Sequence, residues 1–176
     1  DTFMLTAPTS GETPWGDYSF TVTATSGELV KTSTVGLWVN PQGLTDVTYS
    51  NNDSVSIPDN DANGVTSTIT VGDELTVFGH SSYINITHTW IGDLIVTLTS
   101  PSGTSAVLHN RSGGSADDID QSFSSAAFNG EVATGDWTLT VSDNAGADTG
   151  TLNNWSMTIT GLGETTPAAP EADFSF

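Results

Sequence analysis

The chain has 176 residues, which suffice for one domain with appendages or for two small domains, and for a buried core. It has 21 Asp and Glu but only two Lys and Arg, and this net charge of −19 disfavours binding to nucleic acid or anionic membranes. The absence of cysteine excludes disulfides and cysteine-based zinc sites. No signal peptide or membrane span is visible, and a first residue of Asp leads us to expect a piece of a longer secreted precursor.

Residues 1–45 predict a β-hairpin followed by a linker. Segments 18–25 and 31–39 alternate apolar and polar residues on either side of a Ser-Gly-Glu turn. An isolated hairpin is marginal in water, so we expect it either to pack on the sandwich predicted for the following residues or to complete a sheet with another polypeptide. Its predicted apolar face consists of Phe20, Val22, Val35, Leu37 and Val39.

Residues 46–162 predict a β-sandwich. Alternating strands are expected at 65–71, 75–90, 94–99, 107–109, 137–141 and 155–159. β-Branched residues recur with turn signals about every ten residues, and no segment has a helical period. Residues 111–125, rich in Gly, Ser and Asp, are expected to form an ordered loop anchored by Ile119 and Phe123. The fold class is therefore all-β.

Three motifs resemble a known family: Thr87–Thr104, with a hinge at Gly92-Asp93; Gly135–Asp143; and Gly150–Ile159. In this order they resemble the P domain (P/Homo B) of kexin-like and other secreted proteases. The resemblance implies a jelly-roll sandwich over 46–162 and a non-catalytic accessory role, supporting the folding, stability or substrate access of a parent peptidase.

The flanking segments carry weaker resemblances. The hairpin resembles the last two strands of an immunoglobulin-like or fibronectin-like linker domain, and its preceding strands are missing. After a linker from residue 163, residues 170–176 resemble the opening strand of a polycystic-kidney-disease-type repeat. We therefore expect three parts, 1–45, 46–162 and 163–176.

No segment predicts a catalytic site. Ser102-Gly-Thr-Ser-Ala106 is similar to the nucleophile segment of subtilisin-like proteases, but it opens a strand instead of a helix, so we interpret it as a turn. The three histidines, His80, His88 and His109, lack zinc-site spacing and are expected on strand faces. The fragment is predicted not to be an enzyme, and its parent to be a serine or metallo-endopeptidase.

Oxygen ligands without basic partners are the chemical signal in this sequence, because Ca²⁺ prefers carboxylate, amide and carbonyl oxygens. Three segments qualify. The first also contains Asn63 and the third also contains Asn144, and the only basic residue near the second is Arg111. Their predicted calcium ligands are Asp59, Asp61, Asp117, Asp118, Asp120, Asp143 and Asp148. The alternative is that these aspartates only cap turns.

Two further interpretations depend on single residues. Arg111 is expected to pair with a carboxylate, and the resemblance to P domains points to Asp93. Trp90, Trp137 and Trp155 are expected to fill the core. Two alternative functions stay open: a carbohydrate-binding or adhesive module, which a row of exposed aromatics would favour, and a structural subunit whose hairpin donates strands to a neighbour.

Overall fold

The computed structural model describes residues 16–39 and 43–163, without the side chain of Trp38. The chain divides into two compact units, residues 1–44 and 45–176. Pro41 and Gln42 of the linker predicted at Pro41–Gly43, and the linker and repeat predicted after Gly163, lie outside the described residues. Within the described residues, no helix is long and apolar enough to cross a membrane.

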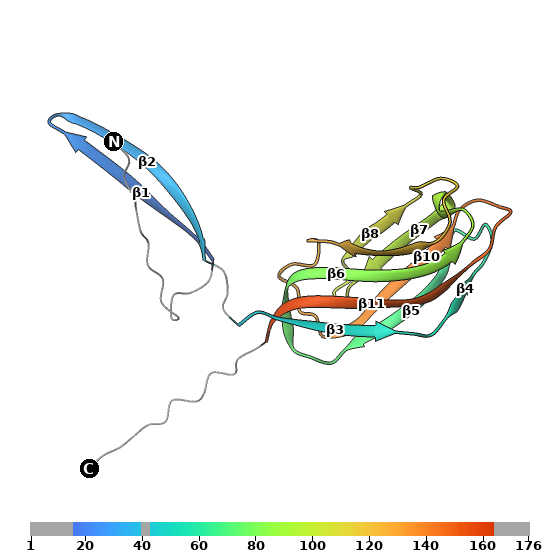
Figure 1. The fold of residues 1–176 in the computed structure, drawn as a ribbon. Helices are drawn as coiled ribbons and strands as arrows, with labels where there is room; N and C mark the ends of the chain where they lie inside the picture. Colours follow the sequence, from blue (N-terminus) through green and yellow to red (C-terminus); the bar gives the residue numbers. More distant parts are fainter. Residues whose placement is uncertain (1–15, 40–42, 164–176) are drawn as a thin grey trace, which may run out of the picture. The chain divides into compact units, whose positions relative to one another are not determined.

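The first unit contains an antiparallel hairpin of β1 (Gly16–Ser26) and β2 (Leu29–Val39) (Figure 1). All eleven residues of β1 pair with β2 without a register shift. Gly27, with φ of +59°, provides the left-handed residue that the tight turn requires. The predicted N-terminal hairpin is therefore confirmed.

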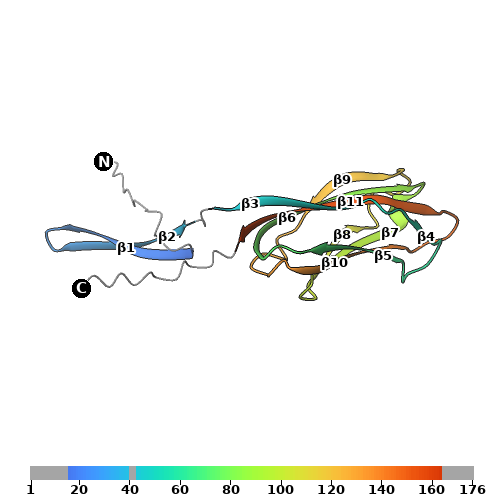
Figure 2. The ribbon, with the colours of Figure 1, turned by 90° about the horizontal axis from the view of Figure 1, so that it is seen from below.

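The second unit is a sandwich of two antiparallel sheets, whose layers are seen edge-on in Figure 2. The first sheet has the order β5 (Val65–Val71), β10 (Gly135–Asp143), β7 (Leu94–Thr99), β8 (Ser105–Asn110). The second has the order β3 (Thr45–Asn51), β11 (Gly150–Gly163), β6 (Leu75–His88), β9 (Ile119–Ser124), with β4 (Val55–Ile57) also beside β11. The all-β sandwich is confirmed, and the jelly-roll connectivity stays a prediction.

Alternation along each strand determines which side chains fill the space between the sheets. Leu94, Val96 and Leu98 of β7 are fully buried, whereas the residues between them are partly exposed. Trp137 and Trp155 are also buried, as predicted. Because their indole N–H groups need acceptors, each donates a hydrogen bond, Trp155 to Ser67 Oγ (2.9 Å) and Trp137 to the Ala133 carbonyl oxygen (2.8 Å). The Trp155 bond joins β11 to β5 across the core.

Two local predictions were wrong. Residues 119–124, predicted as loop, form β9, which pairs with β6. Its alternation is broken because Gln121 is exposed and polar on the inward side, where Ile119 is buried and Phe123 packs against the core. Trp90 is 45% exposed, because β6 ends at His88 and the chain then turns through a 3₁₀ turn, Ile91–Asp93.

His80 is a buried polar residue in this core. Its Nε2 lies 2.8 Å from Ser82 Oγ, and its Nδ1 has no hydrogen-bond partner. The ring stacks with Trp137 and meets Phe128 edge-on, with centroid separations of 6.1 Å and 5.0 Å. Burial lowers the pKa of His80 to about 4, because the charged form would lose its hydration.

This lowered pKa predicts acid destabilisation. An unfolded His80, with a pKa of about 6.5, binds a proton before the folded one does, so stability falls as the pH is lowered from about 6.5 to about 4. Relative to a His80→Phe variant, the wild type should lose roughly 2 to 3 kcal/mol between about pH 7 and about pH 4.5, measured by urea unfolding. A difference that does not change with pH would contradict this.

Candidate functional site

Two of the three predicted acidic segments lie side by side at one end of the sandwich. Asp59 is in the loop between β4 and β5, and Asp143 and Asp148 flank the turn between β10 and β11. The two carboxylate oxygens of Asp59 accept the backbone N–H of Ala147 at 3.1 Å and 3.3 Å. Asp148 accepts a hydrogen bond from the Thr89 hydroxyl at 2.5 Å. The turn between β10 and β11 is therefore hydrogen-bonded both to the loop between β4 and β5 and to the residue after β6.

The third segment meets this end of the sandwich at His88, the last residue of β6. Asp118 Oδ1 accepts the backbone N–H of His88 at 2.9 Å, and the Asp118 N–H donates to the His88 carbonyl oxygen at 2.9 Å. His88 Nε2 lies 3.3 Å from Asp143 Oδ2, and both side chains are fully buried. His88 therefore joins the loop between β8 and β9 to the end of β10.

The hydrogen bonds of His88 also identify its tautomer. The backbone N–H of Trp90 donates to Nδ1 at 3.1 Å. Because a backbone N–H can only donate, Nδ1 is unprotonated and Nε2 carries the hydrogen that faces Asp143. Gly150 leaves room for this ring, since a Cβ there would lie 2.4 Å from His88 Cδ2 and 2.7 Å from the Thr87 carbonyl oxygen.

Asp61 and Asp120 form hydrogen bonds to residues other than His88. Asp61 Oδ1 accepts the N–H of Asn63 at 2.9 Å and so caps its own turn. Asp120 lies on β9, where it accepts the Tyr83 hydroxyl at 2.6 Å, a bond that raises the pKa of Tyr83. Asp117 is exposed.

Within residues 16–39 and 43–163, no three His, Asp or Glu side chains are grouped closely enough to hold a metal ion. Four of the predicted ligands accept backbone N–H bonds: Asp61 and Asp143 cap their own turns, whereas Asp59 and Asp118 accept from distant segments. Each of these carboxylates still has unused lone pairs. The assignment of the seven aspartates as calcium ligands stays a prediction.

The Ser102–Ala106 segment forms the predicted turn and the start of β8. The Ser102 hydroxyl donates to Glu131 Oε2 at 2.7 Å, and Ser105 Oγ lies 2.9 Å from Thr99 Oγ1 on β7. Burial alone would raise the pKa of Glu131, but hydrogen bonds from this turn lower it overall. The hydrogen bonds of Ser102 and Ser105 thus hold neighbouring segments together, and neither of them goes to a histidine.

Arg111 and Asp93 pair as expected, although weakly. Arg111 Nη2 lies 3.7 Å from Asp93 Oδ1, and the Arg111 side chain is 46% exposed, so the contact is not bidentate. Arg111 Nε also donates to the Gly92 carbonyl oxygen at 3.2 Å. The pair supports the corner that precedes β7.

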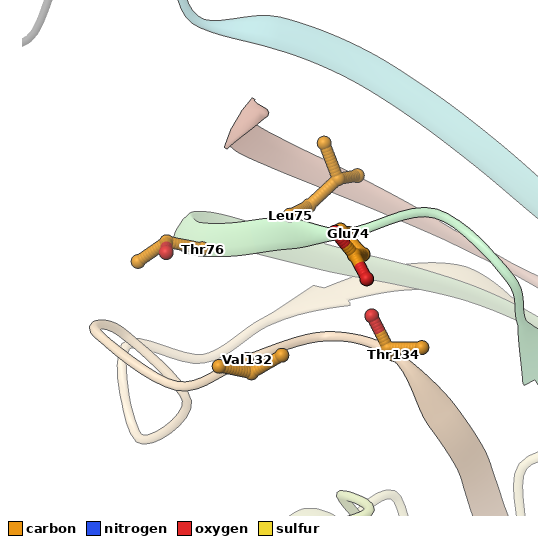
Figure 3. Close-up of a pocket in the computed structure, with 5 residues that line it drawn as sticks. All are labelled: Glu74, Leu75, Thr76, Val132 and Thr134. Carbon is orange, nitrogen blue, oxygen red and sulfur yellow. The ribbon is translucent and has the colours of Figure 1, made fainter. Parts of the chain in front are cut away.

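A pocket of about 310 Å³ lies at the start of β6, at the other end of the strand from His88 (Figure 3). Glu74 and Thr134 point toward each other across the pocket. Val132, which is 60% exposed, lies on the same side of the pocket as Thr134. Its polar lining consists of the Glu74 carboxylate and the hydroxyl groups of Thr76 and Thr134, with no histidine among the lining residues. Of the aromatic side chains in residues 43–163, only Trp90 is exposed, so the row of aromatics expected of a carbohydrate-binding module is not present there.

Sequence reasoning missed the role of His88. His88 is the next buried position after Ile84 and Ile86 in the alternation of β6, and Asp143 follows Val141 in the same way in β10. The sequence did contain a signal for a buried pair. The buried positions of one strand end on His, and those of another end on Asp.

Comparison with known proteins identifies the class of domain. Residues 80–159 match the family model described as proprotein convertase P-domain. The leupeptin-inactivating enzyme 1 of Streptomyces exfoliatus is 43% identical over 116 residues, which are 63% of this chain and 26% of that protein. A calcium-dependent protease of Trichormus variabilis is 42% identical over 85 residues, which are 43% of this chain and 12% of that protein.

A solved structure shows the same fold. The crystal structure of a serine protease of Aeromonas sobria superimposes with a TM-score of 0.60 at 22% identity, over 70% of this chain and 28% of that one. The chain spans about a quarter or less of the length of the Streptomyces and Trichormus relatives. Residues 80–159 thus match a P domain of the proprotein convertase type, and the resemblance predicted from the three motifs is confirmed.

Removing the imidazole of His88 is expected to be strongly destabilising, because Asp143 would stay buried without its ring partner. A His88→Leu variant should lose about 2 to 4 kcal/mol of unfolding free energy in chemical denaturation, because the buried carboxylate would lose its ring N–H donor. The double variant with Asp143→Asn should recover part of the loss, because the amide can still cap the turn at Ala145 without a buried charge. A single-variant loss below about 1 kcal/mol, the value of an exposed pair, would contradict the role of His88.

The close contact at Gly150 gives a second stability test. A Gly150→Ala variant should lose about 1 to 3 kcal/mol, since its methyl group would overlap the His88 ring and the Thr87 carbonyl group. Gly72→Ala is the matched control, because a Cβ there meets nothing within 4 Å. Equal melting temperatures for the two variants would show that the His88 ring can shift without cost.

Proposed function

We propose that residues 45–163 are the accessory domain of a secreted bacterial protease and support the folding, stability or substrate access of its peptidase domain. The observation that carries this function is the P-domain match, in a region that makes up 26% and 12% of two relatives named as a leupeptin-inactivating enzyme and a calcium-dependent protease. The parent peptidase, a serine or metallo-endopeptidase, is then the direct partner.

The role is tested in the parent polypeptide. Deleting residues 45–163 should lower the yield of secreted active protease or shorten its half-life on heating, and adding the His88→Leu substitution to the intact protein should act in the same direction. The purified fragment itself should not hydrolyse casein or ester substrates. Unchanged yield, heat stability and substrate range after the deletion would contradict an accessory role.

Calcium is the ion that this domain is proposed to bind. The support is the acidity of the chain, the convergence of acidic loops near His88, and the names of the calcium-dependent protease relatives. Because no three acidic or histidine side chains of the described residues form a cluster, a bound ion would also need backbone carbonyl or amide oxygens. The proposed carboxylate ligands are Asp59, Asp61, Asp117, Asp118, Asp120, Asp143 and Asp148.

Calcium should therefore raise the melting temperature by several degrees. At about 10 mM, an ion bound with extracellular affinity stabilises the fold by roughly 1 to 3 kcal/mol per site. The comparison is a thermal melt in excess chelator against one in CaCl₂ at matched ionic strength, because screening alone stabilises so acidic a chain. Asp59→Asn and Asp117→Asn should reduce the shift, and Asp46→Asn, whose carboxylate instead accepts the Thr160 hydroxyl, is the control. Specific calcium binding would be contradicted if magnesium raised the melting temperature as much as calcium does. It would also be contradicted if calcium raised it equally in Asp59→Asn, Asp117→Asn and Asp46→Asn.

A further inference from the structure

The pocket at the start of β6 has walls that backbone hydrogen bonds already hold in place. One wall is the beginning of β6, and the other is the segment that leads from β9 into β10 (Figure 3). The Ala133 N–H donates to the Leu75 carbonyl oxygen at 2.8 Å, and Thr76 and Val132 form an antiparallel bridge beside this bond. A ligand would therefore enter a site that is already formed and would not have to order the segments around it.

Two side chains of this pocket offer hydrogen-bond acceptors only. The oxygen atoms of Glu74 and Thr134 face each other across the pocket (Figure 3). The Thr134 hydroxyl already donates its hydrogen to the Asp73 carbonyl oxygen at 2.8 Å, so its oxygen can only accept a further bond. Within the described residues, no hydrogen bond or ion pair engages the Glu74 carboxylate. A ligand that fits between these oxygens must therefore bring donors.

The charge of the domain indicates that this ligand is a cation. Arg111 is the only Lys or Arg of residues 43–163, and it pairs with Asp93 at the corner before β7, so it does not neutralise Glu74. Donors that carry a positive charge form the stronger hydrogen bonds to a carboxylate. A calcium ion needs roughly six to eight oxygen ligands, and no three acidic or histidine side chains of the described residues are grouped around this pocket.

A lysine side chain matches the pocket better than an arginine side chain does. The three N–H donors of an ammonium group diverge, so they can reach Glu74 and Thr134 on opposite sides, whereas the planar guanidinium fork suits a single carboxylate. Leu75 and Val132 line the same pocket and can cover the methylene groups of lysine. The ligand class is therefore a primary ammonium group on an alkyl chain.

We propose that this pocket binds a lysine side chain of the attached peptidase domain, an inference that rests on the accessory role proposed above. The chain enters the sandwich and leaves it at this end, because Thr45 of β3 pairs with Gly161, and Leu75 pairs with Gly163 of β11. The P-domain relatives are several times longer than the matched region, so in them the domain is one part of a longer chain. A domain attached here stays close to the pocket, and this proximity sustains a contact that would be weak between separate molecules.

Lysine recognition is tested by NMR titration of the 176-residue chain with Nα-acetyl-lysine N-methylamide at matched ionic strength. The Glu74, Leu75 and Val132 amide signals should shift saturably, with millimolar affinity, whereas the norleucine analogue, which lacks the ammonium group, should leave them unchanged. Glu74→Gln should weaken binding about 10-fold. The matched control is Glu28→Gln, which removes the same charge from the turn between β1 and β2 and should leave the affinity unchanged.

The source of the lysine is tested in the parent polypeptide with a carbodiimide, which joins a carboxylate to an amine in contact with it. Mass spectrometry should find Glu74 coupled to a lysine of the peptidase domain.

The proposal is overturned if the norleucine or arginine analogue binds as tightly as the lysine probe, or if Glu74→Gln and Glu28→Gln weaken binding equally. It is also overturned if Glu74 couples to no lysine of the peptidase domain. Failure of the accessory role would instead appear as an unchanged protease after deletion of residues 45–163, with binding of the lysine probe unaffected.

Discussion

The buried contact between His88 and Asp143 is the constraint on which the arrangement of the acidic loops depends. It joins the last residue of β6 to the last residue of β10, and so links the two sheets at one end of the core. The backbone of His88 is bonded to Asp118, and its second ring nitrogen accepts the Trp90 N–H. Because every polar group of this residue is used, its ring and the segments around it have one favourable arrangement.

This arrangement accounts for how so acidic a chain can bring several loops together. Each approaching carboxylate is met by an N–H or O–H donor, as Asp59 is by Ala147 and Asp148 by Thr89, so the loops are positioned by the protein itself. A calcium ion would then bind to loops that are already in place and reduce their mutual repulsion. The arrangement therefore stabilises this end of the sandwich.

Much of the fold could be predicted from the sequence, because alternation alone identifies strands with one buried face, as in β5 and β7. Strand β9 could not, because Gln121, on its inward side between Ile119 and Phe123, is polar and exposed, so the alternation is broken. The acidic segments were visible from composition. Their meeting at His88 was not, since Asp118 and Asp143 lie 30 and 55 residues away from it and are brought there by the pairing of separate strands.

Hydrogen exchange of the loop amides in a His88→Gln variant tests most directly whether His88 organises this end of the domain. We predict that protection falls together at Trp90, Asp118 and Ala145, which lie in three different segments, while the central amides of β7 and β10 stay protected. Loss of protection at Trp90 alone, with Asp118 and Ala145 unchanged, would contradict the account and show that the three segments are held independently.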